Sequence, residues 1–262
     1  MKLAISGKGG VGKTTLTALL AQVYADKGYG VFAVDADPSP CLAGAIGVPQ
    51  ELKAKLNPIS EMDDLIYERT GAKPGTTGGF FTLNPRVDDI PDRFSVTHRG
   101  IQLLEMGSVD LGGSGCICPE SAMLKTLFTH LLFREDEVLL LDMYAGVEHL
   151  GRATVDFVDA MIVVVEPTRR SLGTASQIKK LAEDIHLSRL WLVGNKVQTQ
   201  DEADFLENNT PGIPVLGSLP NVQGVLEADR LGIAVYDHVP ELKYAAEKIA
   251  AKIEDIIEEQ PK

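Results

Sequence analysis

The chain has 262 residues, of which 44% are hydrophobic and 24% charged, ordinary values for a globular protein with a sizeable core. Its formal net charge of -12 disfavours nucleic acid as a partner, because the densest basic groups are only pairs such as Arg169-Arg170. There is no run of about 18 apolar residues, and the first expected strand begins too close to Met1 to leave room for a signal peptide. We therefore expect a cytoplasmic protein without a membrane partner.

Apolar, β-rich runs alternate with helical patterns through most of the chain. Near-continuous runs of Val, Leu and Ile are typical of parallel strands buried on both faces. The expected strands are 2–6, 31–34, 102–105, 138–141, 161–165, 190–194 and 215–219, and the expected helices are 14–27, 122–133, 171–185 and 242–257. This alternation predicts an α/β fold in which helices flank both faces of a mostly parallel sheet, as a single domain spanning residues 1–262.

Residues 51–99 break this alternation, because they are rich in Pro, Gly, Asp and Thr. A long irregular stretch inside a compact domain is usually functional or mobile. Since it follows the second strand, we expect it over the carboxyl edge of the sheet, where open α/β folds bind ligands. The alternative is a poorly ordered surface insertion of no consequence.

A phosphate-binding motif follows the first strand. Residues 7–14 read Gly-Lys-Gly-Gly-Val-Gly-Lys-Thr and fit the P-loop pattern without a mismatch, between a strand and an amphipathic helix. The motif predicts that backbone N–H groups cradle the phosphates of ATP or ADP, that Lys13 reaches the β- and γ-phosphates, and that Thr14 ligates Mg²⁺. The expected nucleotide-binding residues of this loop are Gly9, Gly10, Val11, Gly12, Lys13, Thr14 and Thr15. The alternative, a chance glycine-rich turn, does not explain this context.

A second lysine, Lys8, makes the loop resemble the deviant Walker A class of MinD/ParA/ArsA-like P-loop NTPases. The resemblance implies an ATP hydrolase that works as a homodimer. In that class the early lysine crosses the dimer interface and touches the phosphates of the partner's nucleotide, much as an arginine finger does. Lys8 and Lys13 are therefore the predicted catalytic cations.

Three aspartates follow apolar strands. Asp35 and Asp37 lie two apart, so both are expected to project toward the phosphate site. The resemblance implies that Asp37 orients or deprotonates the attacking water and that Asp35 lies near Mg²⁺; two surface carboxylates are the alternative. Asp142 ends the strand 138–141 in the Walker B pattern and is predicted to hold Mg²⁺ through water.

The remaining expected nucleotide-binding residues, Asn195, Lys196 and Pro220, lie at the ends of two later strands. Asn195 precedes Lys196, and in this class the asparagine amide reads the adenine edge, because an amide can donate and accept at once. Pro220 comes directly after the last apolar strand and is expected to pack on the base. Residues 143–149 occupy the switch II position, in which Gly146 would let the loop sense the γ-phosphate.

Cys116 and Cys118 suggest a cargo. Cysteines at i and i+2 are poorly placed for a mutual disulfide but can present both sulfurs to one soft metal. Two thiolates leave a four-coordinate site incomplete, and the same pair from a second subunit across a two-fold axis would complete it. The alternative is two small buried residues.

Taken together, these motifs resemble the CooC-type ATPases that mature carbon monoxide dehydrogenase. Besides the P-loop, the resemblance rests on Asp-Ala-Asp-Pro at 35–38, on Cys-x-Cys-Pro-Glu at 116–120, and on Ala-Gly-Val-Glu-His-Leu at 145–150. It implies that Cys116 and Cys118 bind Ni²⁺ (Zn²⁺ suits the same ligands) at the dimer interface. The implied client is carbon monoxide dehydrogenase, alone or within an acetyl-CoA synthase complex. A further hypothesis is that Glu148 and His149 couple the nucleotide and metal sites; a structural pair is the alternative.

Two other functions stay open. A MinD/ParA-like positioning switch on membrane or DNA is disfavoured because the last helix, though amphipathic, ends in a run of acidic residues that anionic lipid would repel. An electron-transfer ATPase with a bridging Fe–S cluster is disfavoured because such relatives use two well-separated cysteines per chain rather than a close Cys-x-Cys.

Overall fold

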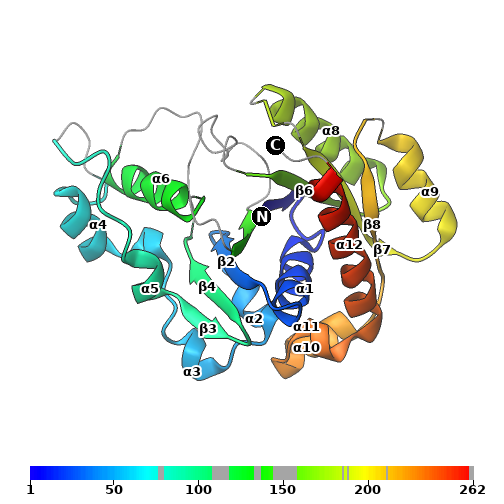
Figure 1. Ribbon diagram of the computed structural model, residues 1–262, viewed down its shortest axis with the longest axis horizontal. Coiled ribbons are helices and arrows are strands. Elements are labelled where there is room, and N and C mark those ends of the chain that lie inside the picture. The colour runs from blue at the N-terminus through cyan, green and yellow to red at the C-terminus, as the bar shows by residue number, and fades with distance from the viewer. Residues whose placement is uncertain are drawn as a thin grey trace.

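The computed structural model describes residues 1–75, 80–107, 118–132, 137–143, 158–184, 186–187, 189–210 and 212–259. Within these ranges, eight strands form one sheet in the order β3-β4-β2-β5-β1-β6-β7-β8, and every neighbouring pair is parallel except β3 with β4 (Figure 1). The strands are β1 (Lys2–Gly7), β2 (Gly30–Ala36), β3 (Val96–His98), β4 (Ile101–Glu105), β5 (Glu137–Met143), β6 (Ala160–Val165), β7 (Leu190–Val197) and β8 (Val215–Pro220).

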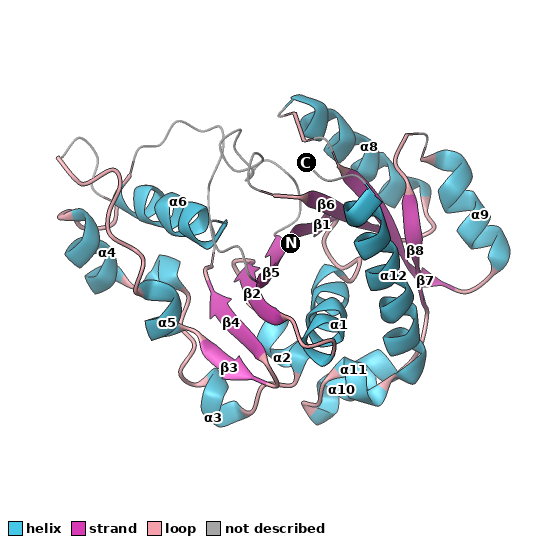
Figure 2. Cartoon of the chain, viewed as in Figure 1, coloured by secondary structure: helices cyan, strands magenta, loops and turns pink. Residues whose placement is uncertain are grey.

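Helices cover both faces of this sheet (Figure 2), as the sequence predicts. On one face lie α1 (Lys13–Asp26), α2 (Leu42–Ile46), α3 (Gln50–Lys53), α10 (Gly224–Leu231), α11 (Val235–His238) and α12 (Pro240–Glu259). On the other lie the 3-10 helix η1 (Ile59–Glu61), α4 (Asp63–Thr70), α5 (Ile90–Phe94), α6 (Pro119–Leu132), α8 (Arg169–Asp184) and α9 (Gln200–Asn209). The four predicted helices correspond to α1, α6, α8 and α12.

Each central strand supplies both hydrophobic cores. In β1, Leu3 and Ile5 belong to the core under α1 and α12, whereas Ala4 between them belongs to the core under α6 and α8. Successive side chains of a strand point to opposite faces, so a strand covered on both sides must be apolar throughout. This explains why the seven predicted strands are confirmed, whereas the short edge strand β3 had no comparable signal.

The expectation of an irregular stretch at 51–99 is wrong, because this segment contains η1, α4, α5 and β3. It begins in α3 and reaches the carboxyl end of β4 at η1, where the Ser60 amide donates to the Met106 carbonyl oxygen over 3.1 Å. It then returns along the sheet and pairs with the amino-terminal half of β4 as strand β3. Helix α4 packs against α6 on the way. The helices were missed because they are short; α4 has only eight residues and ends at Gly71, whose φ is 80°.

Among the described helices, none combines the length and apolar character that crossing a bilayer requires.

Candidate functional site

The phosphate loop follows β1, which is flanked in the sheet by β5 and β6. Two of its positions require glycine. A Cβ on Gly7 would lie 2.5 Å from the carbonyl oxygen of Val164, and Gly12, with φ 97°, caps the N-terminus of α1 where a Cβ would collide with the Asn195 amide. Gly9 and Gly10, by contrast, are exposed. The loop is thus held by its neighbours near both ends and is exposed in the middle.

The two lysines of the loop differ in their environment. Lys13 is only 7% exposed and its Nζ lies 3.4 Å from the Lys8 carbonyl oxygen, so the ammonium lies against the loop that it is predicted to serve. The side chain of Lys8 is exposed, and none of the ion pairs within the described residues involves it. Its predicted reach to a partner's nucleotide is therefore sterically open.

Asp142 is a buried carboxylate close to the Thr14 hydroxyl and the Lys13 ammonium. It is 1% exposed, and neither oxygen makes a hydrogen bond of normal geometry to any described residue. Burial raises the pKa of Asp142 to about 7; Asp35 and Asp37 also raise it, whereas the Thr14 hydroxyl and the Lys13 ammonium oppose the shift. An orphaned buried carboxylate beside the P-loop threonine fits a bound divalent cation, so the donor set suits Mg²⁺.

Asp35 lies beside Asp142, with which it is paired in register, but its oxygens are engaged by backbone. One oxygen accepts from the amide of Asp37 over 3.1 Å, and the other from the amides of Cys41 and Leu42 over 2.8 and 2.9 Å. Burial, first of all, raises the pKa of Asp35 despite these hydrogen bonds. These contacts give Asp35 a role in shaping the loop before α2, and its proximity to Mg²⁺ stays a prediction.

Asp37 lies just beyond the end of β2 and is partly exposed. One of its carboxylate oxygens accepts from the Ser39 amide over 2.9 Å, which fixes the turn, and within the described residues the other oxygen accepts no hydrogen bond. Asp37 follows Asp35 by two residues, and its charge, like those of Asp35 and Asp142, adds to the effect of burial in raising the pKa of the Cys41 thiol. Its predicted action on the attacking water remains to be tested.

Asn195 and Lys196 both touch the phosphate loop. The Asn195 amide nitrogen donates to the Val11 carbonyl oxygen over 2.6 Å, and Lys196 Nζ donates to the Gly10 carbonyl oxygen over 3.2 Å. Lys196 also pairs with Glu166 at 2.5 Å, a contact that the sequence pattern did not reveal. The Asn195 amide nitrogen has a second N–H besides the one that bonds Val11, so it can still donate to a base, as predicted.

A pocket of about 230 Å³ opens beside Thr14 and Thr15, between α1, α2 and α10. Cys41 lies on the α2 side, and Leu226 and Asp229 lie on the α10 side. The last residue of β8, Pro220, is paired with Val197 of β7, and the chain then runs into α10. The predicted contact of Pro220 with the base has no further support.

Cys118 immediately precedes α6 and is 9% exposed, with its sulfur 3.0 Å from the Ser121 hydroxyl. Cys116 lies outside the described residues, as do Gly146, Glu148 and His149 of the predicted switch II region. No group of three or more metal-ligating side chains occurs within the described part of the chain. The structure therefore places one of the two predicted metal ligands, at the start of a helix.

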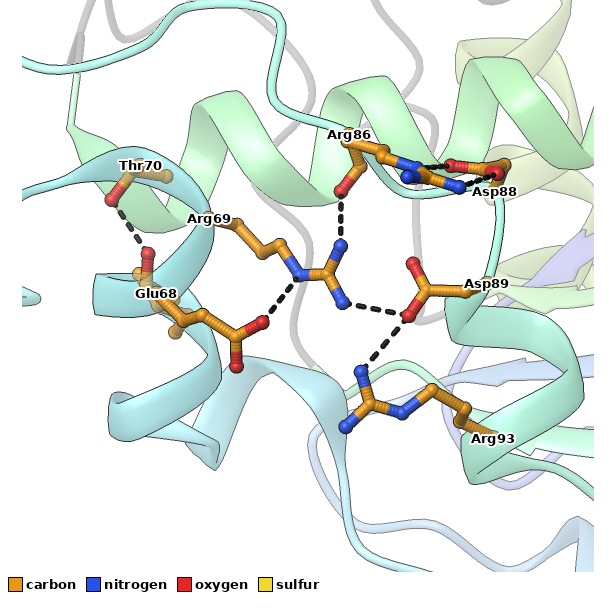
Figure 3. A network of polar contacts seen from close by, with 8 residues as sticks. Glu68, Arg69, Thr70, Arg86, Asp88, Asp89 and Arg93 are labelled. Atoms are coloured by element: carbon orange, nitrogen blue, oxygen red, sulfur yellow. Dashed lines mark hydrogen bonds and ion pairs between the residues drawn. The ribbon is translucent and has the colours of Figure 1, made fainter.

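The segment that covers α6 is tied together by an ionic network (Figure 3). Arg69 of α4 donates to Asp89 over 2.7 Å and to the Arg86 carbonyl oxygen over 3.3 Å, and Arg93 of α5 donates to the same Asp89 oxygen over 2.9 Å. Arg69 and Arg93 hold the pKa of Asp89 well below its usual range. The segment also contacts α6 directly, because the Gly75 amide donates to Glu120 over 3.1 Å.

Comparison with known proteins agrees with this geometry. Residues 2–235 match the family model of the CobQ/CobB/MinD/ParA nucleotide binding domain. The chain is 46% identical to the carbon monoxide dehydrogenase accessory protein CooC of Rhodospirillum rubrum, covering 97% of this chain and 96% of that one. It is also 46% identical to an uncharacterised ATP-binding protein of Methanocaldococcus jannaschii, over 88% and 90% of the two chains.

Among solved structures, the septum site-determining protein MinD of Pyrococcus horikoshii, complexed with Mg-ADP, superposes with a TM-score of 0.65 at 20% identity, covering 97% of this chain and 96% of that one. At this identity the likeness concerns the fold alone. The family match and the full-length relatives carry the assignment further: the chain belongs to the CobQ/CobB/MinD/ParA nucleotide-binding family and is a P-loop ATPase of the CooC-like type.

Proposed function

We propose that this ATPase is a metallochaperone that binds nickel at the interface of a homodimer and assists its insertion into the active-site cluster of carbon monoxide dehydrogenase. The observation that carries the proposal is the 46% identity to a carbon monoxide dehydrogenase accessory protein along 97% of the chain. A likeness spread over the whole length includes the nucleotide site and the region of the cysteines, and is not a shared P-loop alone.

The cysteine pair supplies the chemistry that such a cargo needs. Thiolates select soft metals such as Ni²⁺ and Zn²⁺ over Mg²⁺, whose preferred ligands are carboxylates and water. Cys118 lies at the start of α6, and Cys116 precedes it by two residues. In the proposal, the pair and its symmetry mate in a second subunit complete a site of four thiolates across a two-fold axis.

The nucleotide site supplies the switch. Thr14 and Asp142 would hold Mg²⁺, which neutralises charge on the β- and γ-phosphates when bound. Lys13 binds the same phosphates from within the chain, and Asp37 orients the water that attacks the γ-phosphate. Lys8 would act across the dimer interface, so hydrolysis would follow dimerisation and could be coupled to release of the metal.

The test is metal binding by anaerobically purified, reduced and metal-free protein. Nickel is titrated into the wild type and into Cys116→Ser/Cys118→Ser, while light scattering reports the oligomeric state. Cys41→Ser is the matched control, because Cys41 is the third cysteine of the chain and lies at the nucleotide pocket. We expect one nickel per dimer in the wild type and in the control, and none in the double variant, which should still bind ATP.

Equal nickel binding by the wild type and the double variant, or none by either, would overturn the proposal. The same samples distinguish a rival function. Relatives of this chain include an iron-sulfur cluster carrier protein of Clostridium perfringens, 24% identical over 82% of this chain. A brown protein with sulfur-to-iron absorbance and no affinity for nickel would favour a cluster-bridged dimer instead.

A further inference from the structure

The pocket beside the phosphate loop extends from the phosphate site to helix α10. It is lined by Thr14 and Thr15 on one side and by α10 on the other, where Leu226 is apolar and Asp229 carries a negative charge. The P-loop pattern accounts for the two threonines but not for α10. An ionised carboxylate only accepts hydrogen bonds, so the part of a ligand that reaches Asp229 would carry donors such as hydroxyl groups.

Asp229 is free to bind such a group. It is exposed, and within the described part of the chain its carboxylate makes neither a hydrogen bond nor an ion pair. Its backbone is nevertheless fixed, because its carbonyl oxygen accepts from the Gly232 amide over 3.1 Å and the preceding Ala228 is fully buried. The carboxylate and Cys41 line the same pocket, and the charge of Asp229 helps to raise the pKa of that thiol, after the larger effects of burial and of Asp35, Asp37 and Asp142.

The position of Thr15 indicates which part of a nucleotide would enter. P-loop amides cradle the α- and β-phosphates, so the sugar attached to the α-phosphate leaves the loop next to the first turn of α1. Thr15 lies in that turn and lines the pocket. It is also near Asn195, because a Cβ on Gly12 would lie 4.0 Å from the Thr15 hydroxyl and against the Asn195 amide. The sugar would therefore lie between Asn195 and α10.

We infer that Asp229 accepts hydrogen bonds from the ribose hydroxyls of the bound nucleotide and makes the ATPase selective for ribonucleotides. A carboxylate with two acceptor oxygens matches a cis-diol, and the apolar side chains of α10 can cover the carbon atoms of the sugar. This inference rests on nucleotide binding by the family and is independent of the proposed metal site.

The test compares ATP with 2′,3′-dideoxy-ATP, which lacks both ribose hydroxyls. Dissociation constants are measured for the wild type, Asp229→Ala and Glu227→Ala. Glu227 is the matched control, because it lies on the same helix but pairs with His238 at 3.4 Å and is not part of the pocket. We expect the wild type and Glu227→Ala to bind dideoxy-ATP about tenfold more weakly than ATP, as loss of hydrogen bonds to a charged acceptor predicts.

Asp229→Ala should bind ATP about tenfold more weakly than the wild type does. The variant should also bind ATP no more tightly than it binds dideoxy-ATP. Equal affinity of the wild type for both nucleotides would overturn the inference, and so would discrimination that persists in Asp229→Ala or disappears in Glu227→Ala. Nickel binding is not measured in this experiment, so its outcome leaves the metallochaperone proposal to its own test.

Discussion

The phosphate loop and the start of α6 are held in place in different ways. The loop lies at the centre of the sheet, where Gly7 abuts the backbone of β6 and the Asn195 side chain donates to Val11. Helix α6, which begins next to Cys118, is instead covered by a peripheral layer that includes α4 and the network around Asp89 (Figure 3). The nucleotide site therefore lies on the sheet itself, whereas Cys118 lies at the start of a helix that is packed between the sheet and this peripheral layer.

The largest expected effect is at Asp142, within the central region. Asp142→Asn should lower the rate of ATP hydrolysis by about 10²-fold or more, because the predicted Mg²⁺ site loses its charged ligand. Without Mg²⁺ and nucleotide, the same variant should be more stable than the wild type at pH 8, by about 1–3 kcal/mol, because an unpaired buried charge is removed. Chemical denaturation and a steady-state ATPase assay measure the two effects.

The gain in stability should depend on pH. The pKa of Asp142, about 7 in the folded state, lies above its unfolded value of about 3.9, so the folded state holds a proton that the unfolded state has lost. Stability of the wild type therefore falls as the pH rises through this window, and the advantage of Asp142→Asn should be complete above about pH 7 and shrink toward pH 4. A gain that does not change with pH would contradict the assignment.

The next largest effect is expected at Gly12. Gly12→Ala places a Cβ against the Asn195 amide at a φ of 97°, and should cost about 2–4 kcal/mol of unfolding free energy in nucleotide-free protein. Gly9→Ala is the matched control: no atom lies within 4 Å of its added Cβ and its φ is not left-handed, so its stability should change by less than about 1 kcal/mol. Equal losses in the two variants would mean that the centre of the loop is as constrained as its end.

A smaller effect is expected from the peripheral layer. Arg69→Met removes the donors to Asp89 while keeping much of the apolar stem, and should lower the Tm by about 2–4 °C. Amide hydrogen exchange should accelerate in residues 119–132 of α6 and stay unchanged in residues 13–26 of α1. Arg86→Ala is the control, because that side chain is 76% exposed and pairs only with the neighbouring Asp88 within the described residues.

The pH dependence of this network has the opposite sign to that of Asp142. The pKa of Asp89 is held below its usual range, so the network contributes stability at neutral pH and loses it only as the pH falls through that depressed value. If Arg69→Met accelerated amide hydrogen exchange in α1 as well as in α6, the sheet-based nucleotide site would not be independent of the peripheral layer.

The smallest effect is expected at Glu166, whose ion pair with Lys196 is partly exposed on both sides. Exposed ion pairs contribute little, so Glu166→Gln should change the dissociation constant of ATP by less than about threefold. Lys196 would keep its contact with the Gly10 carbonyl oxygen. A change of tenfold or more, measured by titration with a fluorescent ATP analogue, would show that this pair positions the loop.

The sequence alone determined the sheet, the long helices and the phosphate loop. Each of these leaves a local pattern: buried parallel strands are apolar throughout, and a loop that must turn tightly needs glycine at fixed positions. The same reasoning placed Lys13 and Asp142 at the site, because a P-loop and a Walker B strand lie next to each other in the sheet, as β1 and β5 do.

Only the tertiary structure decided how the remaining residues are used. Asp35 was expected near Mg²⁺, and the fold engages its oxygens with the amides of Asp37, Cys41 and Leu42. The helices of 51–99 and the position of Asp229 opposite Thr15 were likewise not foreseen. The physical reason is common to all three. Periodicity and the need for glycine depend on residues that are close in the sequence. Hydrogen-bond partners and pocket linings depend on elements that come together only after the chain has folded.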